Sequence, residues 1–234
     1  MKIRIALAAL LAATSFGAGK ASALTVSFTE HFATNVSGWE NNASSPLTWV
    51  ASGGPDGSSH AATSFNYLGF SGPFGSGPVL FRANDVDNAS GDAFVGNWIS
   101  GGVGSLSVWV YHETPEDLSF FLRVAGTGGF PGAVVPSTTL VAPNTWTRLS
   151  FEIGSPLCVG EGVTCSQAFS SVGNLQLGTT APAALTSLDQ SFLIAIDQVS
   201  TVVPEPGTGL LVGAGLAGLA ALARPARRRA RSRA

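Results

Sequence analysis

The stretch SLSVWVYH, residues 105–112, decides the fold class of this chain. Its aliphatic residues fall on one side of an extended backbone: Leu106, Val108 and Val110. Trp109 and Tyr111 fall together on the other side. A period of two over this length is typical of a half-buried β-strand, because successive side chains of a strand point to opposite faces.

The same alternation recurs elsewhere between residues 24 and 202. The stretches LSFFLRVAG (118–126) and WTRLSFEI (146–153) place apolar residues on one side and polar residues on the other. The stretch SFLIAIDQVSTV (191–202) is apolar on both sides, which predicts a central strand. Gly- and Pro-rich segments separate these stretches, and no helical period lasts beyond two turns. We therefore predict an all-β domain, an antiparallel β-sandwich of jelly-roll type.

The N-terminus has the pattern of a secretory signal peptide over residues 1–23. Lys2 and Arg4 precede an apolar stretch at 5–16, and Ala21-Ser22-Ala23 provides a small-residue cleavage site. The alternative is an uncleaved membrane anchor, but the apolar stretch is short for that role. We expect export and cleavage after Ala23.

The C-terminus has the pattern of a membrane anchor followed by a basic tail. Residues 207–223 carry no charge and, as a helix, would be about 25 Å long, near the lower limit for a bilayer span. Six arginines lie in the tail, residues 224–234. Each costs roughly 2.5–3.5 kcal/mol at a helix centre on the insertion scale, so the tail stays in the cytoplasm and the body lies outside.

Pro204, Glu205 and Pro206 precede this anchor, and the three parts in this order resemble the PEP-CTERM sorting signal of Gram-negative bacteria. The resemblance implies an exosortase as partner, cleavage near the motif, and a producer of exopolysaccharide or biofilm matrix. The body would be held at the inner membrane before processing and would then reach the cell surface or the extracellular matrix. The alternative is an anchor that is never cut. The chain thus divides into residues 1–23, 24–202 and 203–234.

The body is strongly acidic once both terminal segments are set aside. It contains three arginines, thirteen Asp and Glu residues and no lysine, so its formal charge is near −10. Such a surface repels nucleic acid and anionic lipid, and it suits divalent cations or neutral sugars. Solubility alone is an equally good explanation of the charge.

The cysteines of the chain lie close together in CVGEGVTC, at Cys158 and Cys165. In an exported protein this spacing predicts a local disulfide, which would stabilise the fold by roughly 2–3 kcal/mol in the chain-entropy model. A metal site is less favoured, because no second Cys or His pair completes four ligands.

Several stretches of the body resemble laminin-B-like modules and carbohydrate-binding jelly rolls. They are SGWENN (37–42), FVGNWISGGVGSLSVWVYH (94–112), NTWTRLSFEI (144–153) and FLIAIDQVST (192–201). In carbohydrate-binding jelly rolls a calcium ion often joins the first strand, a Gly-rich loop and the last strand. This implies Glu30, Asp56 and Asp197 as calcium ligands, and carboxylates are suitable hard-oxygen donors. The alternative is that Asp197 faces solvent or accepts backbone hydrogen bonds.

Trp109 and Tyr111 are the best candidates for a sugar-binding platform, because aromatic faces stack on the apolar C–H face of a sugar ring. Most tryptophans of a sandwich lie in its core, so the sequence leaves their exposure open. Motifs of hydrolases and nucleotide-binding enzymes are missing from the sequence. We expect a non-catalytic module that binds extracellular glycan. A structural matrix protein without a small ligand is the alternative, and a glycan-active hydrolase is less favoured.

Overall fold

The computed structural model describes residues 27–70 and 77–204. The predicted signal peptide, the transmembrane helix at 207–223 and the basic tail lie outside the described residues, as do Glu205 and Pro206. In the part that is described, no helix combines the length and the apolar character needed to cross a bilayer.

One layer of the body is a six-stranded sheet whose strand pairs are all antiparallel. Five strands follow one another in the order β2-β3-β11-β5-β8, and β1 pairs with β11 as well. Their bounds are β1 Phe28–Glu30, β2 Thr48–Val50, β3 His60–Asn66, β5 Ser105–His112, β8 Thr147–Glu152 and β11 Ser191–Val202.

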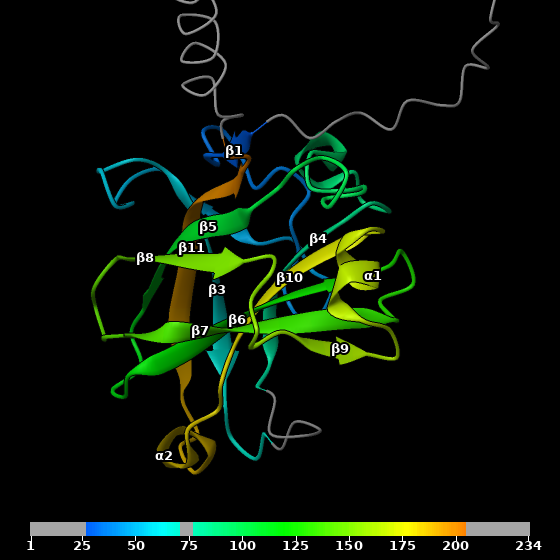
Figure 1. The fold of residues 1–234 in the computed structure, drawn as a ribbon. Helices are drawn as coiled ribbons and strands as arrows, with labels where there is room; N and C mark the ends of the chain where they lie inside the picture. The colour runs from blue at the N-terminus through cyan, green and yellow to red at the C-terminus, as the bar shows by residue number, and fades with distance from the viewer. Residues whose placement is uncertain (1–26, 71–76, 205–234) are drawn as a thin grey trace, which may run out of the picture.

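The other layer is a five-stranded antiparallel sheet in the order β4-β10-β6-β7-β9. Its strands are β4 Val79–Asn84, β6 Leu118–Ala125, β7 Gly132–Val141, β9 Val159–Glu161 and β10 Asn174–Thr179. In Figure 1, β6 and β7 pass in front of β3 and β11. The predicted all-β antiparallel sandwich is confirmed.

The central position predicted for residues 191–202 is confirmed. One edge of β11 pairs with β5, while the other edge is shared by β3 along its first half and β1 along its second. The register with β5 shifts between Asp197 and Ser200, and Gln198 adopts a φ of 48° there. This bulge turns the strand locally, so that the next inward-facing residue is Val199, which is fully buried.

The core lies between the two sheets and is built from the inward-facing residues of the alternating strands. Leu106, Val108 and Val110 of β5 are fully buried, as the alternation of that stretch predicts. Leu122 and Val124 face them from the five-stranded sheet and are also buried. The opposite side of each strand therefore faces away from the core and is free to carry polar or aromatic groups.

Helices are short in the described residues and lie outside the sheets. They are a 3-10 helix at Ala89–Asp92, α1 Cys165–Phe169 and α2 Ala183–Thr186. The helix α1 begins with a capping box, in which Thr164 accepts a hydrogen bond from the Gln167 backbone N–H. Cys165 at its start is bonded to Cys158, so the predicted disulfide is confirmed.

Candidate functional site

A polar pocket lies on the outer face of the five-stranded sheet. Its volume is about 460 Å³, and its polar lining comes from three neighbouring strands and the turn between β6 and β7: Arg82, Arg123, Thr127, Asn174 and Gln176. Gln176 of β10 stands opposite Arg82 of β4 and opposite Arg123 of β6 in the ladder. Side chains opposite one another in a sheet share a face, so the register places these three groups in one row.

Arg123 holds one side of this pocket in a fixed position. Its Nε donates to Glu161 Oε2 at 2.8 Å, its Nη1 donates to Gln176 Oε1 at 2.9 Å, and its Nη2 donates to the Gly129 carbonyl at 2.9 Å. The guanidinium also forms an ion pair with Glu161 at 2.7 Å. Because several bonds fix this half-buried guanidinium, Arg123 and Gln176 are positioned before any ligand arrives.

Three buried polar atoms around this pocket lack a hydrogen-bond partner among the described residues. They are Arg82 Nε and Asn174 Oδ1 in the lining, and Asp85 Oδ1 at the rim. Asp85 belongs to the rim because its other oxygen accepts a hydrogen bond of 2.6 Å from the hydroxyl of Thr127. Buried polar groups are almost always paired, so these three atoms keep hydrogen-bonding capacity that the described residues do not use.

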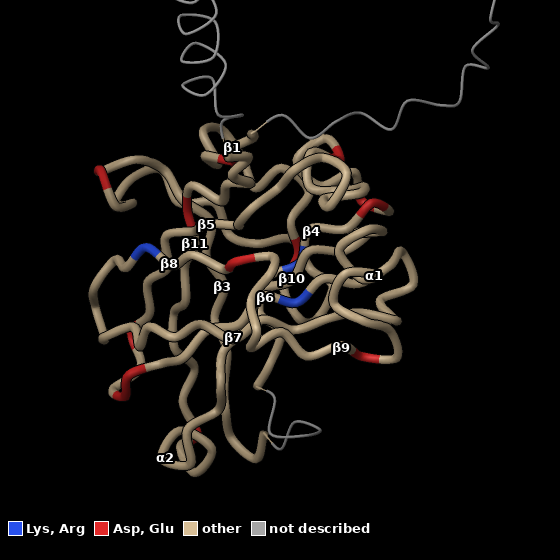
Figure 2. Tube along the Cα trace, viewed as in Figure 1, with Lys and Arg blue, Asp and Glu red and all other residues tan. Residues whose placement is uncertain are grey.

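The charges around the pocket nearly balance. Figure 2 shows two stretches of blue close together near the labels β6 and β10, in a body where red stretches outnumber blue ones. Arg123 is paired with Glu161, while Glu40 forms a bridge opposite Arg82 in the backbone ladder. The pocket therefore has hydrogen-bonding capacity without a large net charge.

The predicted platform residues Trp109 and Tyr111 lie on the outer face of the six-stranded sheet. Both are half-buried, and their strand neighbours on the other side are in the core. Tyr111 packs against Trp146, with ring centroids 5.5 Å apart at 38°, and Trp146 packs edge-on against His60 at 5.4 Å. The Trp146 Nε1–H donates to the Gly53 carbonyl at 2.8 Å, which ties this ring to the loop between β2 and β3.

A second pocket, of mixed polar and apolar lining, continues from this aromatic group along β5 and β8. It has a volume of about 390 Å³ and is lined by Ser105, Ser107, Arg148, Leu149, Ser150 and Val202. Arg148 stands opposite Trp109 in the ladder, and its Nη2 donates to Ser107 Oγ at 3.2 Å. We call the surface made by Trp109, Tyr111, Trp146 and Arg148 with the serines of this pocket the aromatic face.

The three predicted calcium ligands occupy different surroundings. Asp56 and Asp197 are linked through Ser58, whose hydroxyl donates to Asp197 Oδ2 at 2.7 Å and whose N–H donates to Asp56 Oδ1 at 3.1 Å. Both oxygens of Glu30 accept hydrogen bonds, from the Phe32 N–H at 2.8 Å and from the Ser90 hydroxyl at 2.7 Å.

Asp197 is fully buried, and it accepts the Gln198 backbone N–H at 2.7 Å, the kind of bond considered as the alternative to a calcium role. Burial raises the pKa of Asp197 above its ordinary value, whereas hydrogen bonds from Ser58 lower the pKa of the exposed Asp56. Across residues 27–70 and 77–204, no group of three or more His, Cys, Asp or Glu side chains is arranged to hold a metal ion. Calcium binding stays a prediction.

The two histidines of the six-stranded sheet are buried. The His112 Nε2–H donates to the Val141 carbonyl at 2.8 Å, and its Nδ1 lies 2.9 Å from the Thr114 hydroxyl. His60 Nδ1 has no partner among the described residues. Burial lowers the pKa of both imidazoles, so both are neutral at neutral pH.

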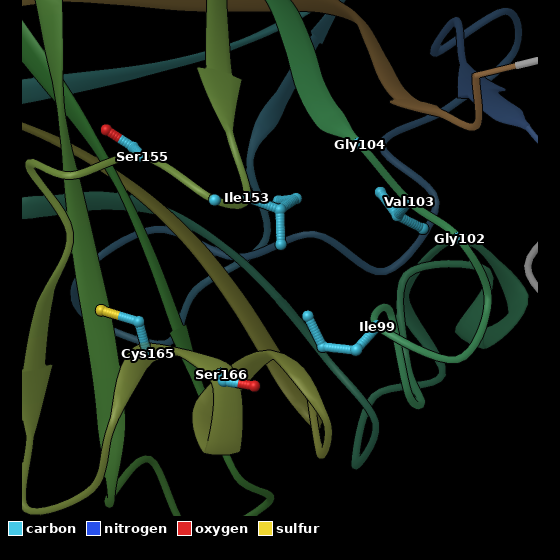
Figure 3. Close-up of a pocket in the computed structure, with 9 residues that line it drawn as sticks. Ile99, Gly102, Val103, Gly104, Ile153, Ser155, Cys165 and Ser166 are labelled. Atoms are coloured by element: carbon cyan, nitrogen blue, oxygen red, sulfur yellow. The ribbon is translucent and has the colours of Figure 1, made fainter.

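An apolar pocket of about 510 Å³ lies where the chain approaches the sorting motif. Figure 3 shows Ile99, Val103 and Ile153 around it, together with Cys165 and Ser166 of α1. The neighbouring Gly104 backbone N–H donates to the Val202 carbonyl at 2.9 Å. The lining offers few hydrogen-bonding side chains, so this pocket suits sugar less well than the polar pocket of the five-stranded sheet does.

Sequence reasoning found Trp109 and Tyr111 but missed Trp146, Arg148 and the whole row of the five-stranded sheet. Alternation had placed Arg123 opposite the apolar side of its strand, which was a usable signal for an outward cation. Arg82, Arg123 and Gln176 come together because of the strand order, and no local sequence pattern predicts that order.

Comparison with known proteins identifies a sorting motif at the C-terminal end of the chain. The PEP-CTERM protein-sorting motif matches residues 202–229, so the resemblance noted for Pro204, Glu205 and Pro206 is confirmed. The match begins at the last residue of β11. No curated protein sequence matches the chain.

Among solved structures, the body is similar to carbohydrate-binding modules of Clostridium thermocellum. A structure of endo-1,4-beta-D-xylanase 10B with CBM22-1 and GH10 modules, complexed with xylohexaose, is 20% identical with a TM-score of 0.44, and the match covers 74% of this chain and 27% of that chain. The C-terminal family 22 module of the same xylanase is 12% identical with a TM-score of 0.44, covering 76% and 95%. The family 30 module of cellulase Cel9D-Cel44B is 10% identical with a TM-score of 0.38, covering 77% and 93%.

Proposed function

We propose that the protein is an exported, non-catalytic module that binds a neutral polysaccharide in the polar pocket of the five-stranded sheet. An exosortase would process it at Pro204–Glu205–Pro206 and so deliver the body to the cell surface or the extracellular matrix. The sorting motif at residues 202–229 supports the export route, because such a motif belongs to proteins sorted outside the cytoplasm. The biofilm setting follows from the same resemblance and is part of the proposal.

The observation that carries the ligand class is the mixed set of unpartnered atoms in the pocket. Arg82 Nε can only donate a hydrogen bond, whereas Asn174 Oδ1 and Asp85 Oδ1 can only accept one. A hydroxyl group donates and accepts at once, so neighbouring hydroxyls of a sugar match this mixed set. The three atoms have almost no surface open to solvent, so a small outward turn of their side chains would accompany binding. A carboxylate would satisfy Arg82 but would leave both oxygens without a donor.

The charge of the site also favours a neutral ligand. Glu161 already neutralises Arg123, and the body as a whole carries a large excess of carboxylates. An acidic polysaccharide would be repelled by this surface before it reached the pocket. Binding without catalysis is supported by the contacts of Glu161, because its Oε2 is already engaged by the Arg123 guanidinium and is not free to act on a sugar.

Calorimetric titration of the full chain, purified in detergent, with xylohexaose, cellohexaose and an oligogalacturonate tests this proposal. We expect binding of a neutral oligosaccharide and none of the acidic one. Asn174→Ala should weaken binding about fivefold, because one hydrogen bond to a ligand contributes about 1 kcal/mol and 1.4 kcal/mol is a factor of ten.

The matched control is Asn42→Ala, at an exposed residue away from the pocket, which should bind like wild type. Preference for the uronate oligomer, or equal binding by the Asn174 variant and wild type, would contradict the proposal. A glycan array that includes the producer's own exopolysaccharide then identifies the sugar. Release of reducing ends from that sugar would support a hydrolase instead.

A further inference from the structure

The aromatic face combines two features that a sugar chain needs. Trp109 and Tyr111 offer half-buried rings. Arg148, beside Trp109 in the ladder, offers hydrogen bonds together with the hydroxyls of Ser105, Ser107 and Ser150. Aromatic rings take the C–H face of a sugar, and the hydroxyls and guanidinium take its O–H groups. From Ser105 to Tyr111 the face extends about 20 Å along β5, at about 3.4 Å per residue, which is room for several sugar rings.

Two of the three rings of this face, those of Trp146 and Tyr111, are held in place by specific contacts. Trp146 is fixed by its hydrogen bond to Gly53 and by contacts with His60 and Tyr111. The Tyr111 hydroxyl lies 3.3 Å from Asn144 Oδ1 and 3.5 Å from Glu113 Oε1. Because these groups are already positioned, binding would require little further ordering of side chains.

The aromatic face and the polar pocket point in opposite directions. The polar pocket is on the outer face of the five-stranded sheet, and the aromatic face is on the outer face of the six-stranded sheet. The buried core separates them, and the backbones of packed sheets are about 10 Å apart. A sugar chain in one site therefore continues away from the other site.

We infer that one molecule holds two polysaccharide chains at once, one on each outer face, and so cross-links the polymer that it binds. This inference rests on the proposed function, because it requires a glycan in the polar pocket. It adds a second site on the aromatic face and a bridging role that a single site cannot perform. Two sites on a rigid body also raise the avidity for a polymer through effective concentration.

A bridging assay with the full chain tests the inference. Beads coated with the neutral polysaccharide found by the glycan array are loaded with protein, washed, and offered the same polysaccharide in fluorescent, soluble form. Captured fluorescence measures bridging, and the amount of protein on the beads measures binding by itself. We expect wild type to capture the fluorescent polymer.

Two variants each disable one face. Arg82→Gln with Asn174→Ala acts on the polar pocket, and Tyr111→Ala with Arg148→Ala acts on the aromatic face. Each should still load the beads and should capture at least tenfold less fluorescent polymer than wild type. An equal mixture of the two variants is the matched control for bridging through aggregates or micelles, and it should also fail to capture.

The outcomes separate this inference from the proposed function. Loading without capture by wild type overturns cross-linking and leaves single-site binding intact. Absence of loading with any polysaccharide overturns both. Capture by the mixture at the wild-type level overturns the inference, because separate molecules would then supply the two sites.

Folding is controlled by a thermal melt of each variant. If Tyr111→Ala unfolds the sheet, Arg148→Glu alone serves as the aromatic-face variant, since Arg148 is exposed. Undiminished capture by Arg148→Glu would then count against the second site.

Discussion

The two outer faces of the sandwich present different chemistry on strands of the same kind. The five-stranded face has amide and guanidinium groups in one cross-strand row, and its strands contain no histidine. The six-stranded face has aromatic rings, a buried carboxyl at Asp197 and a buried imidazole at His60. Alternation sets which residues face outward on both sheets, whereas strand order sets which of them meet.

The faces also differ in how their small residues are used. On the five-stranded face, Gly178 lies beneath the ring of Phe121, which is buried although it is outside the main core. On the six-stranded face, the Gly-rich loop before β3 passes over Asp197, and Ser58 of this loop donates to its carboxyl. Side-chain packing therefore covers Gly178 on the first face, and hydrogen bonds hold the loop over Asp197 on the second.

The largest loss of stability is expected from Gly178→Val on the five-stranded face. A Cβ at this position would overlap the buried Phe121 ring and the Pro78 carbonyl oxygen, which is held by the Thr179 N–H. We expect the free energy of unfolding in urea to fall by about 3 kcal/mol. Gly126→Ala is the control, because nothing lies within 4 Å of its added Cβ, and its change should stay within about 0.5 kcal/mol. Wild-type stability of the valine variant would refute the close packing of this face.

A smaller change in stability is expected from calcium, whose predicted ligands Asp56 and Asp197 lie on the six-stranded face. A site with the affinity usual for extracellular modules, Kd about 10⁻⁴–10⁻³ M, stabilises by about 0.4–1.4 kcal/mol at 1 mM calcium. The predicted ligands near the bulge of β11 are Asp56 and Asp197, so Asp56→Asn should abolish the increase in Tm. Asp87→Asn, at an exposed residue in the turn after β4, should keep it. An unchanged Tm of wild type at millimolar calcium would count against the site.

The calcium effect should weaken as the pH falls. Burial raises the pKa of Asp197, so this carboxyl takes up a proton at a higher pH than an exposed aspartate does. A protonated carboxyl is a poor calcium ligand. The Tm increase measured at neutral pH should therefore shrink in mildly acidic buffer.

The smallest expected effect is a loss of stability in mild acid that originates in the six-stranded sheet alone. Burial lowers the pKa of His112 and His60 below the ordinary value of 6.5. The unfolded chain then binds more protons below pH 6.5, so stability is complete above that pH and falls as the pH drops through it. His112→Gln should flatten the dependence of Tm on pH in this range, whatever its effect at pH 8. His31→Gln changes an exposed residue and should leave the dependence of Tm on pH as it is in wild type. The same dependence in the His112 variant as in wild type would contradict this account.

Local sequence was sufficient for the fold class and for several particular features. The alternation of residues 105–112 and 118–125 gave the core positions, and the run that is apolar on both sides gave the centre of the six-stranded sheet. The disulfide followed from the short spacing of Cys158 and Cys165, and the sorting motif from residues at the end of the chain. Each of these depends on neighbours in sequence, since side-chain direction in a strand has a fixed period of two.

The candidate sites were decided only by the tertiary structure. Trp39 and Trp98 are fully buried while Trp49 is 40% exposed, and no local pattern distinguishes them. Arg82, Arg123 and Gln176 are far apart in the chain and meet because β10 lies between β4 and β6. A strand's own residues fix which side chains point outward, but its neighbours, its register and the loops above it fix what those side chains meet, and binding chemistry depends on that meeting.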